Sequence, residues 1–204
     1  MEGFKAMSNI YTLRITYADC DGRIWREAQI SEYSYLCDLG YMILASFDTL
    51  AYHLFNISFG TTVFSLPTEE EELEPERDLF CVMLKELELK IGDKLEMVYD
   101  FGCDQVFNIE VINISEMPRC SGRAYPKIIA GEGKGILDDI PAYETLELIE
   151  KIDKAGRSDV TYLCQDERER IWDYRDYDIV SDNALLKGQI AQIADGYSYF
   201  EAFI

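Results

Sequence analysis

Five residues at two turns have the types and spacing that suit acid–base chemistry or the binding of a cation. This candidate functional loop consists of Asp100, Gly102, Asp104, Asp138 and Asp139. Paired carboxylates can divide acid and base roles when their surroundings push their pKa values apart, and carboxylate oxygens also bind divalent cations. Aspartate at the end of a strand more often accepts hydrogen bonds from neighbouring backbone N–H groups. The sequence therefore leaves a functional and a local structural interpretation open for these acids.

Cysteine and histidine show no pattern typical of a metal site. The chain has six cysteines, no C-x-x-C pair and one histidine, so a Cys/His zinc site has no support. Cys103 is followed by Asp104, and an acidic neighbour raises a thiol pKa, which opposes an activated nucleophile. We therefore expect no bound metal ion and no cofactor.

Three residues are surface candidates. His53 lies in a predicted strand, where a single histidine is more often a hydrogen-bonded structural residue than a base. Trp25 and Arg26 are adjacent in another predicted strand and offer a binding surface. A tryptophan in the core beside a solvent-facing arginine is the simpler interpretation of this pair.

Alternating hydrophobic residues predict the strands that position these candidates. Strands at 10–17 and 24–30 form a hairpin, because the dipeptide Asp21-Gly22 between them favours a tight turn. Two more strand pairs are predicted at 52–59 with 61–66 and at 95–101 with 106–114.

Apolar residues at three- and four-residue intervals predict the helices. One spans 34–47 with Ser34 as its cap, and a shorter one spans 79–87. Pro141 begins a helix over 142–153 that Gly156 ends. The predicted buried face of that helix consists of Tyr143, Leu146, Ile149 and Ile152. Two further helices are predicted at 159–174 and 183–194.

Two segments are predicted to be loops. Residues 69–78 carry seven acids, and such a run is typical of a solvated loop. Residues 118–141 contain Gly131, Gly133 and Gly135, whose G-x-G-x-G spacing does not match a nucleotide-binding loop. We interpret these glycines as sites of unusual backbone angles.

The order of these elements predicts the fold class. Strands come in hairpin pairs instead of alternating with helices, so we expect an α+β fold with a mixed, mostly antiparallel sheet and helices packed on one face. We place one domain at 8–156 and a helical C-terminal extension at 157–204 that packs on the same domain.

The charge balance excludes several partners. The chain has 39 acidic and 19 basic residues, a net charge of −20, which disfavours binding to nucleic acids and to anionic membrane surfaces. Neither a signal peptide nor an apolar run of membrane-spanning length is present. Scattered thiols without an export signal indicate a reducing cytoplasm. The acidity serves solubility or, alternatively, imitates DNA.

Motifs along the chain resemble the plasmid pRiA4b ORF-3-like family, from about Tyr11 to Ile179. The motifs of this resemblance are Tyr11 to Ile15, Ile24-Trp25-Arg26, Leu36, Asp38, Leu39, Ile43, His53 to Ile57, Tyr99-Asp100-Phe101-Gly102, Tyr125-Pro126, Gly131, Gly133, Asp138-Asp139, Trp172 and Tyr177-Asp178. The resemblance implies an association with plasmids and mobile elements, and the biochemical role of the family is largely unassigned.

The departures from the family pattern affect polar residues. Cys103, Gln105 and Phe107 stand where the family has Asp, Trp and His, and Ile128 and Gly135 replace two loop cysteines. The resemblance therefore implies that this chain lacks any chemistry that needs those side chains.

Three functional hypotheses follow. The first is a cytoplasmic, non-enzymatic protein-interaction module linked to mobile elements, with an unknown protein partner. The second is a metal-dependent enzyme that uses Asp100 with Asp138 or Asp139 as oxygen ligands. The third is an acidic mimic of DNA that inhibits a nucleic-acid-binding protein.

Overall fold

A seven-stranded sheet forms the centre of the protein. The computed structural model describes residues 7–18, 20, 22–67, 74–118, 125–163 and 168–201. The sheet order is β4-β3-β5-β6-β1-β2-β7, and all of its strand pairings are antiparallel. Its strands are β1 (Met7–Tyr17), β2 (Trp25–Ser31), β3 (Phe55–Phe59), β4 (Thr62–Ser65), β5 (Lys94–Tyr99), β6 (Gln105–Pro118) and β7 (Lys127–Glu132).

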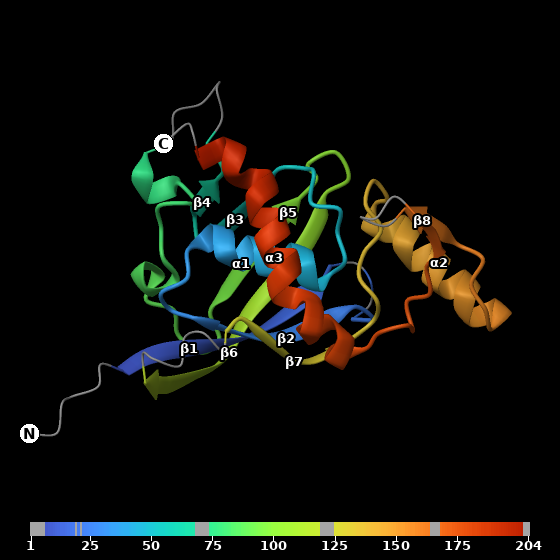
Figure 1. Ribbon diagram of the computed structural model, residues 1–204, viewed down its shortest axis with the longest axis horizontal. Helices are drawn as coiled ribbons and strands as arrows, with labels where there is room; N and C mark the ends of the chain where they lie inside the picture. The colour runs from blue at the N-terminus through green and yellow to red at the C-terminus, as the bar shows by residue number, and fades with distance from the viewer. Residues whose placement is uncertain are drawn as a thin grey trace, which may run out of the picture.

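Helices cover one face of this sheet. Figure 1 shows α1 (Leu36–Ser46) and α3 (Ile179–Glu201) in front of the strands, and the two helices contact each other. A third helix, α2 (Ala142–Ala155), precedes a small hairpin of β8 (Thr161–Leu163) and β9 (Glu169–Ile171). Two short 3-10 helices, η1 (Pro75–Arg77) and η2 (Leu84–Leu87), complete the structure. The predicted α+β fold is thus confirmed.

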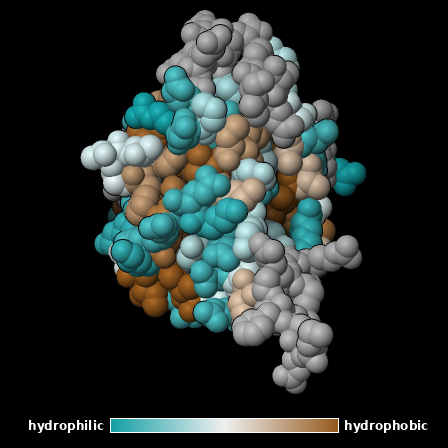
Figure 2. Space-filling view, turned by 90° about the vertical axis from the view of Figure 1, so that its left-hand side faces the viewer, coloured by the Kyte–Doolittle hydropathy of each residue, from teal (hydrophilic) through white to brown (hydrophobic). Residues whose placement is uncertain are grey.

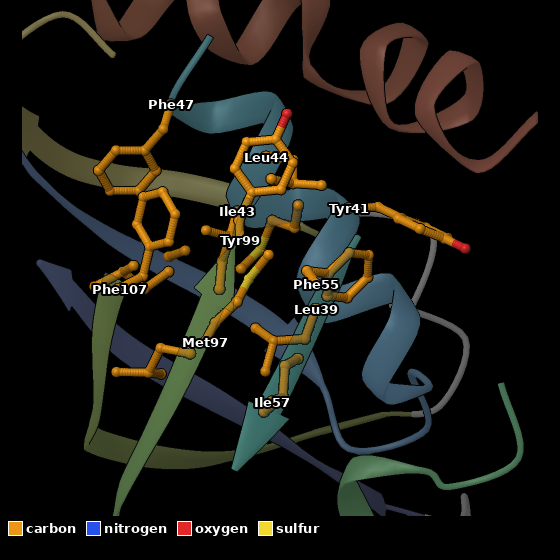
Figure 3. Packing of buried hydrophobic residues seen from close by; sticks show 14 of the residues in the cluster. Leu39, Tyr41, Ile43, Leu44, Phe47, Phe55, Ile57, Met97, Tyr99 and Phe107 are labelled. Carbon is orange, nitrogen blue, oxygen red and sulfur yellow. The ribbon is translucent and has the colours of Figure 1, made fainter. Parts of the chain in front are cut away.

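The core lies between the sheet and α1. Figure 3 shows the α1 residues Leu39 and Ile43 packed with Phe55, Met97 and Phe107 from the strands beneath. Every residue of α1 except its single aspartate is buried, which requires apolar side chains on all sides of the helix. Because α3 packs on α1, the outer side of α1 is also shielded from solvent.

The three predicted hairpins are present, with two differences. β3 begins at Phe55, so His53 precedes the strand and lies in a loop. Residues 127–132 form β7 at the edge of the sheet, although the sequence predicted an irregular segment there. The strand has only six residues, and the glycines in and after it led to the prediction of a loop.

Gly131, Gly133 and Gly135 allow close contacts between backbone segments. A Cβ atom on Gly135 would lie 1.9 Å from the Phe47 carbonyl oxygen. A Cβ atom on Gly133, which has a φ of +77°, would lie 2.5 Å from the Arg23 carbonyl oxygen. The spacing of these glycines is therefore explained by packing and does not require a bound phosphate.

The helix predictions were correct in part. α1 begins after Tyr35 instead of Ser34, and the Tyr35 backbone N–H donates to Asp38 Oδ2 at 2.9 Å. α2 begins after Pro141 and ends at Gly156 as predicted, although Tyr143 is exposed. The helix predicted at 79–87 is only the 3-10 turn η2.

The helix predicted at 159–174 was wrong, because this stretch contains β8 and β9. The backbone N–H of Trp172 donates to the Val160 carbonyl at 2.7 Å and continues the hairpin beyond its strands. The helix predicted at 183–194 is the middle of the longer α3. Residues 69–73 of the predicted acidic loop, together with Asp21, Cys120 and Cys164, lie outside the described residues.

Arg26 and Trp25 have the opposite burial to the one predicted. Arg26 is 0% exposed, and its guanidinium donates to the carbonyl oxygens of Ser46, Trp25, Glu132 and Gly133. It also lies 3.9 Å from the centroid of the Tyr177 ring. Trp25 faces the opposite side of β2 and is only half-buried. The strand alternation decides this outcome, because residue 26 shares its face with the core residue Ala28.

Candidate functional site

Strand register brings His53 and Asp100 together. β3 and β5 are neighbouring antiparallel strands in which Phe55 pairs with Tyr99. The residues just before β3 therefore lie next to the residues just after β5. The backbone N–H of Asp100 donates to the Leu54 carbonyl at 3.1 Å and continues this pairing.

Gln105 positions the loop that carries the acidic pair. Its buried side-chain amide donates to the carbonyl oxygens of Leu137 at 3.3 Å and Ile140 at 2.8 Å. The hydroxyl of Tyr17 donates to the Gln105 side-chain oxygen. These bonds hold both ends of the Asp138-Asp139 turn against the start of β6.

His53, Asp100 and Asp139 form one cluster. His53 Nε2 lies 2.9 Å from Asp139 Oδ1 and 3.5 Å from Asp100 Oδ2. One potential ligand atom from each residue lies within 4.8 Å of the other two. We call these three residues the His53 cluster.

One oxygen of the His53 cluster lacks a hydrogen-bond partner. Asp100 is 5% exposed, and its Oδ2 atom accepts no hydrogen bond from the described part of the chain. The 3.5 Å separation from His53 Nε2 is too long for a good hydrogen bond. Its other oxygen, Oδ1, accepts the backbone N–H of Gly102 at 3.1 Å. Leaving a charged oxygen buried and unpaired costs more than the about 1–3 kcal/mol of a neutral group.

The backbone at the site adopts left-handed angles. Asp100, Asp104 and Asp139 have φ values of 53°, 49° and 60°. Such angles are uncommon outside glycine, and aspartate tolerates them better than most residues. Aspartate therefore suits these positions, because the turn after β5 and the turn in the loop before α2 require left-handed backbone angles.

Tyr52 and His53 contact different oxygens of the Asp139 carboxylate. The Tyr52 hydroxyl donates to Asp139 Oδ2, while Oδ1 faces His53. The hydrogen bond from Tyr52 lowers the pKa of Asp139, and the bond to His53 adds to this effect. The Asp139 carboxylate is thus held in its charged form.

Asp138 has a different role from its neighbour. Its Oδ1 accepts the Tyr99 hydroxyl at 2.7 Å and its Oδ2 accepts the Leu50 backbone N–H at 2.9 Å. Burial raises the pKa of Asp138 in spite of these bonds. Since both oxygens already accept hydrogen bonds, Asp138 connects loops and is not part of the His53 cluster.

Asp104 also lies outside the cluster. It is exposed, and its backbone N–H donates to the Asp100 carbonyl at 2.9 Å. Cys103 is partly exposed, and burial together with the nearby Asp100 carboxylate raises the pKa of its thiol to about 11. This shift opposes a nucleophilic role for Cys103.

The C-terminal helix contacts the histidine loop. The Tyr197 hydroxyl of α3 donates to the His53 carbonyl oxygen. The Tyr197 ring stacks on Tyr41 of α1, with centroids 5.5 Å apart, and contacts the edge of Phe55. Residues far apart in the sequence therefore set the position of His53.

Sequence reasoning identified all three residues of the His53 cluster but did not connect them. The missed contributors are Tyr52, Tyr99, Gln105 and Tyr197, which support the cluster through hydrogen bonds. Gln105 was noted only for replacing a family tryptophan. The pairing of the strand at 52–59 with the strand at 95–101 brings His53 next to Asp100. Turn residues predict pairing only between strands that follow each other in the sequence, so this pairing was not predicted.

Comparisons with known proteins identify the family and agree with the fold. The chain has a TM-score of 0.60 to the crystal structure of MM3350, a protein of unknown function from Methanosarcina mazei Go1. The sequences are 22% identical over 74% of this chain and 84% of that chain, so the likeness concerns the fold. A search of curated proteins finds no match. The family model of the plasmid pRiA4b ORF-3-like protein matches residues 9–180, and the chain therefore belongs to that family.

Proposed function

We propose that the protein binds a divalent metal ion through His53, Asp100 and Asp139 and acts as a metal-dependent enzyme. The observation that carries this proposal is the buried Asp100 Oδ2 atom, which has no hydrogen-bond partner and faces His53 Nε2. A cation between these atoms gives the buried Oδ2 atom a partner that compensates for the loss of its hydration. The three segments of the chain that contain His53, Asp100 and Asp139 also meet at this place.

The separations within the His53 cluster suit a small ion. Two ligands at about 2.1 Å from one ion, about 90–109° apart, are separated by about 3.0–3.4 Å. The observed distances from His53 Nε2 are 2.9 Å and 3.5 Å. Both distances from His53 Nε2 are close to this range, and the ligand atoms of all three residues lie within 4.8 Å of one another.

The ligand types favour a first-row transition metal. An imidazole nitrogen with two carboxylate oxygens suits Zn²⁺, Mn²⁺ or Fe²⁺ better than Ca²⁺ or Mg²⁺, which prefer oxygen ligands. Three protein ligands leave coordination positions open, as in catalytic sites. An ion held there supplies Lewis acidity and lowers the pKa of bound water. Tyr52 orients the Asp139 carboxylate from outside, and its hydrogen bond fixes which oxygen faces His53.

Metal titration of the chelator-treated protein tests the proposal. Zn²⁺ or Mn²⁺ at about 100 times its Kd stabilises the native state by about 2.7 kcal/mol. For a chain of this length that corresponds to a Tm rise of about 5–10 °C. Mg²⁺ and Ca²⁺ serve as comparison ions and are expected to produce smaller shifts.

Two variants with the same charge change make the test specific. Asp100→Asn removes a ligand, so we expect the metal affinity to fall by more than the about 10–100-fold typical of outer-shell partners. Asp104→Asn is the matched control, because Asp104 also has a left-handed backbone but lies outside the cluster. Calorimetry that detects no binding, or equal binding by wild type and Asp100→Asn, contradicts the proposal.

A protein-interaction role is the second candidate. The large apolar residues Val180, Leu185 and Tyr199 of α3 are 75%, 61% and 60% exposed. Figure 2 shows hydrophobic residues reaching the surface on the face viewed there. Binding of a partner that is lost in Leu185→Glu but kept in Asp100→Asn supports this role, and unchanged binding in Leu185→Glu contradicts it.

Cytoplasmic location and a link to mobile elements complete the proposal. The described cysteines Cys20, Cys37, Cys81 and Cys103 form no disulfide bond, which suits a reducing compartment. No helix among the described residues has the length and apolar character needed to cross a membrane.

Acidic mimicry of DNA is supported by the net charge of −20. The face shown in Figure 2 does not favour it, because hydrophilic and hydrophobic residues are mixed there. Salt-sensitive binding to a basic DNA-binding protein tests the mimicry.

A further inference from the structure

A small pocket adjoins the His53 cluster. It has a volume of about 250 Å³ and is lined by Leu50, Tyr52, Leu137, Asp138, Asp139, Ile140, Thr161 and Tyr162. Its walls thus come from the loop before β3, the loop before α2, and the β8 strand. Three elements far apart in the sequence meet there, so the pocket is a product of the tertiary structure.

Tyr52 and Asp139 belong to both the pocket and the metal site. Asp139 faces His53 through one oxygen and accepts the Tyr52 hydroxyl through the other. A molecule in the pocket therefore lies against a proposed metal ligand and its supporting residue. Of the three residues of the His53 cluster, Asp139 lines this pocket.

Two carboxyl groups and one nearby lysine set the polarity of the pocket. Asp138 and Asp139 bring two carboxyl groups to the pocket, and Asp139 also lies 2.9 Å from His53 Nε2. Lys134 lies 5.8 Å from the centroid of the Tyr162 ring, but its charge also faces Asp48 and Asp182. An ion bound at the His53 cluster adds positive charge beside these carboxyl groups, so the lining alone does not set the charge of the ligand.

The lining favours a compact apolar group. Leu50, Leu137 and Ile140 contribute aliphatic surface, and Tyr52 and Tyr162 contribute aromatic rings. The volume is below the about 300–1,000 Å³ typical of sites for drug-sized ligands. One ring or one short branched chain therefore fits.

We propose that this pocket binds the substrate of the metal centre, and that the substrate carries an oxygen donor next to an aromatic or branched aliphatic group. This inference rests on the proposed metal-binding function. The oxygen donor takes an open coordination position beside Asp139, and the apolar group occupies the space between Tyr52 and Tyr162.

Two hydroxamic acids that differ only in their apolar group test the inference, and each binds a metal ion as the hydroxamate anion after losing its N–OH proton. Calorimetry on the Zn²⁺-loaded protein compares benzohydroxamate with acetohydroxamate. We expect benzohydroxamate to bind about tenfold tighter, because its ring removes additional apolar surface from water.

Variants separate the pocket from the metal. Tyr162→Ala is expected to remove most of the preference for benzohydroxamate and to leave the Zn²⁺ affinity unchanged, whereas Tyr162→Phe keeps the preference. Ile140→Ala provides a second pocket variant should Tyr162→Ala fold poorly. Tyr143→Ala is the control, since Tyr143 is exposed on α2 and does not line the pocket.

The outcomes distinguish this inference from the proposed function. If the protein binds no metal, both the metal centre and the substrate assignment are wrong. If Zn²⁺ binds but the two hydroxamates bind equally well, or if neither pocket variant changes the preference, only the substrate assignment is wrong.

Discussion

Asp100 combines two roles in one side chain. Its Oδ1 atom accepts the Gly102 backbone N–H and closes a turn, while Oδ2 faces His53 without a hydrogen bond. Asparagine can make the same turn bond and tolerates the left-handed φ of 53°. The structural and metal-binding roles can therefore be separated by mutation.

Asp100→Asn and Asp100→Ala are expected to differ in stability. The metal-free Asn variant should unfold within about 0.5 kcal/mol of wild type, because the turn is kept and one unpaired charge is removed. The Ala variant loses both the turn bond and tolerance for positive φ, so we expect a loss of about 1–2 kcal/mol. Urea denaturation measures both values, and equal losses would contradict the separate roles.

Cys103 should react slowly with iodoacetamide at neutral pH. Burial and the Asp100 carboxylate raise the pKa of its thiol to about 11, so little thiolate is present. We expect the alkylation rate to increase as pH approaches this value, and Asp100→Asn to accelerate the reaction at a given pH. Peptide mass mapping of the metal-free protein assigns the modified cysteine. Rapid modification of Cys103 at pH 7 in wild type would refute the shift.

At the scale of elements, close backbone contacts tie the loop before α2 to the end of α1. The Ile136 backbone N–H donates to the Phe47 carbonyl at 2.8 Å, and Gly135 lies directly against that carbonyl. The Trp172 indole N–H donates to the Gly135 carbonyl at 3.3 Å. This junction determines where the following Asp138-Asp139 turn lies.

Alanine is expected to have opposite effects at two glycines. In Gly135→Ala the new Cβ would lie 1.9 Å from the Phe47 carbonyl oxygen, so we expect a loss of about 3 kcal/mol or more. In Gly188→Ala the Cβ meets nothing within 4 Å on α3, so we expect a gain of about 0.5–1 kcal/mol. Denaturant unfolding of both variants checks the signs, and a neutral Gly135→Ala would show that the loop can move.

The first turn of α3 is expected to be sensitive to pH. Burial and the nearby Asp48 carboxylate raise the pKa of Asp182 from 3.8 to about 6. The positive charges of Arg26 and Lys134 lower this pKa, and the Asp178 carboxylate raises it further. A raised carboxyl pKa means that the native state binds the proton more tightly than the unfolded state. Stability from this group is therefore lost as pH rises from about 4 to about 6.

Asp182→Asn should remove this loss. We expect its Tm to exceed that of wild type above pH 6 and to match wild type near pH 4. Thermal unfolding across this pH range measures the difference, and the comparison of variant with wild type cancels the other carboxyl groups. A constant Tm difference at all pH values would contradict the assignment to Asp182.

At the scale of the whole molecule, the net charge of −20 produces self-repulsion. Ion pairs such as Arg14–Glu27 at 3.1 Å and Arg23–Asp153 at 2.8 Å are partly exposed and add little stability. Screening should therefore weaken repulsion more than attraction. This balance makes the response to salt a property of the complete chain.

Added salt is expected to raise the Tm. The screening length falls from about 30 Å at 0.01 M to about 10 Å at 0.1 M, which weakens repulsion between distant acids. Thermal unfolding at several NaCl concentrations measures the effect, with KCl as a control for ion identity. A Tm that falls with salt would show that ion pairs outweigh repulsion.

Local sequence patterns predicted much of the fold. Alternation and turn residues located three hairpins, and helical periodicity located α1 and α2, because these signals depend on neighbours in the sequence. The hairpin at 161–171 was missed because its charged residues show no clear alternation. Arg26 was misplaced because burial of a charge depends on the carbonyl groups and rings that surround it.

The sequence by itself determined the family, the fold class and the residue types available for chemistry. The tertiary structure alone decided that His53, Asp100 and Asp139 meet while Asp138 and Asp104 do not. The physical reason is that the pairing of β3 with β5 and the Gln105 bonds to the loop at 137–140 join distant segments. Such contacts follow from the burial of the whole core and not from any local pattern.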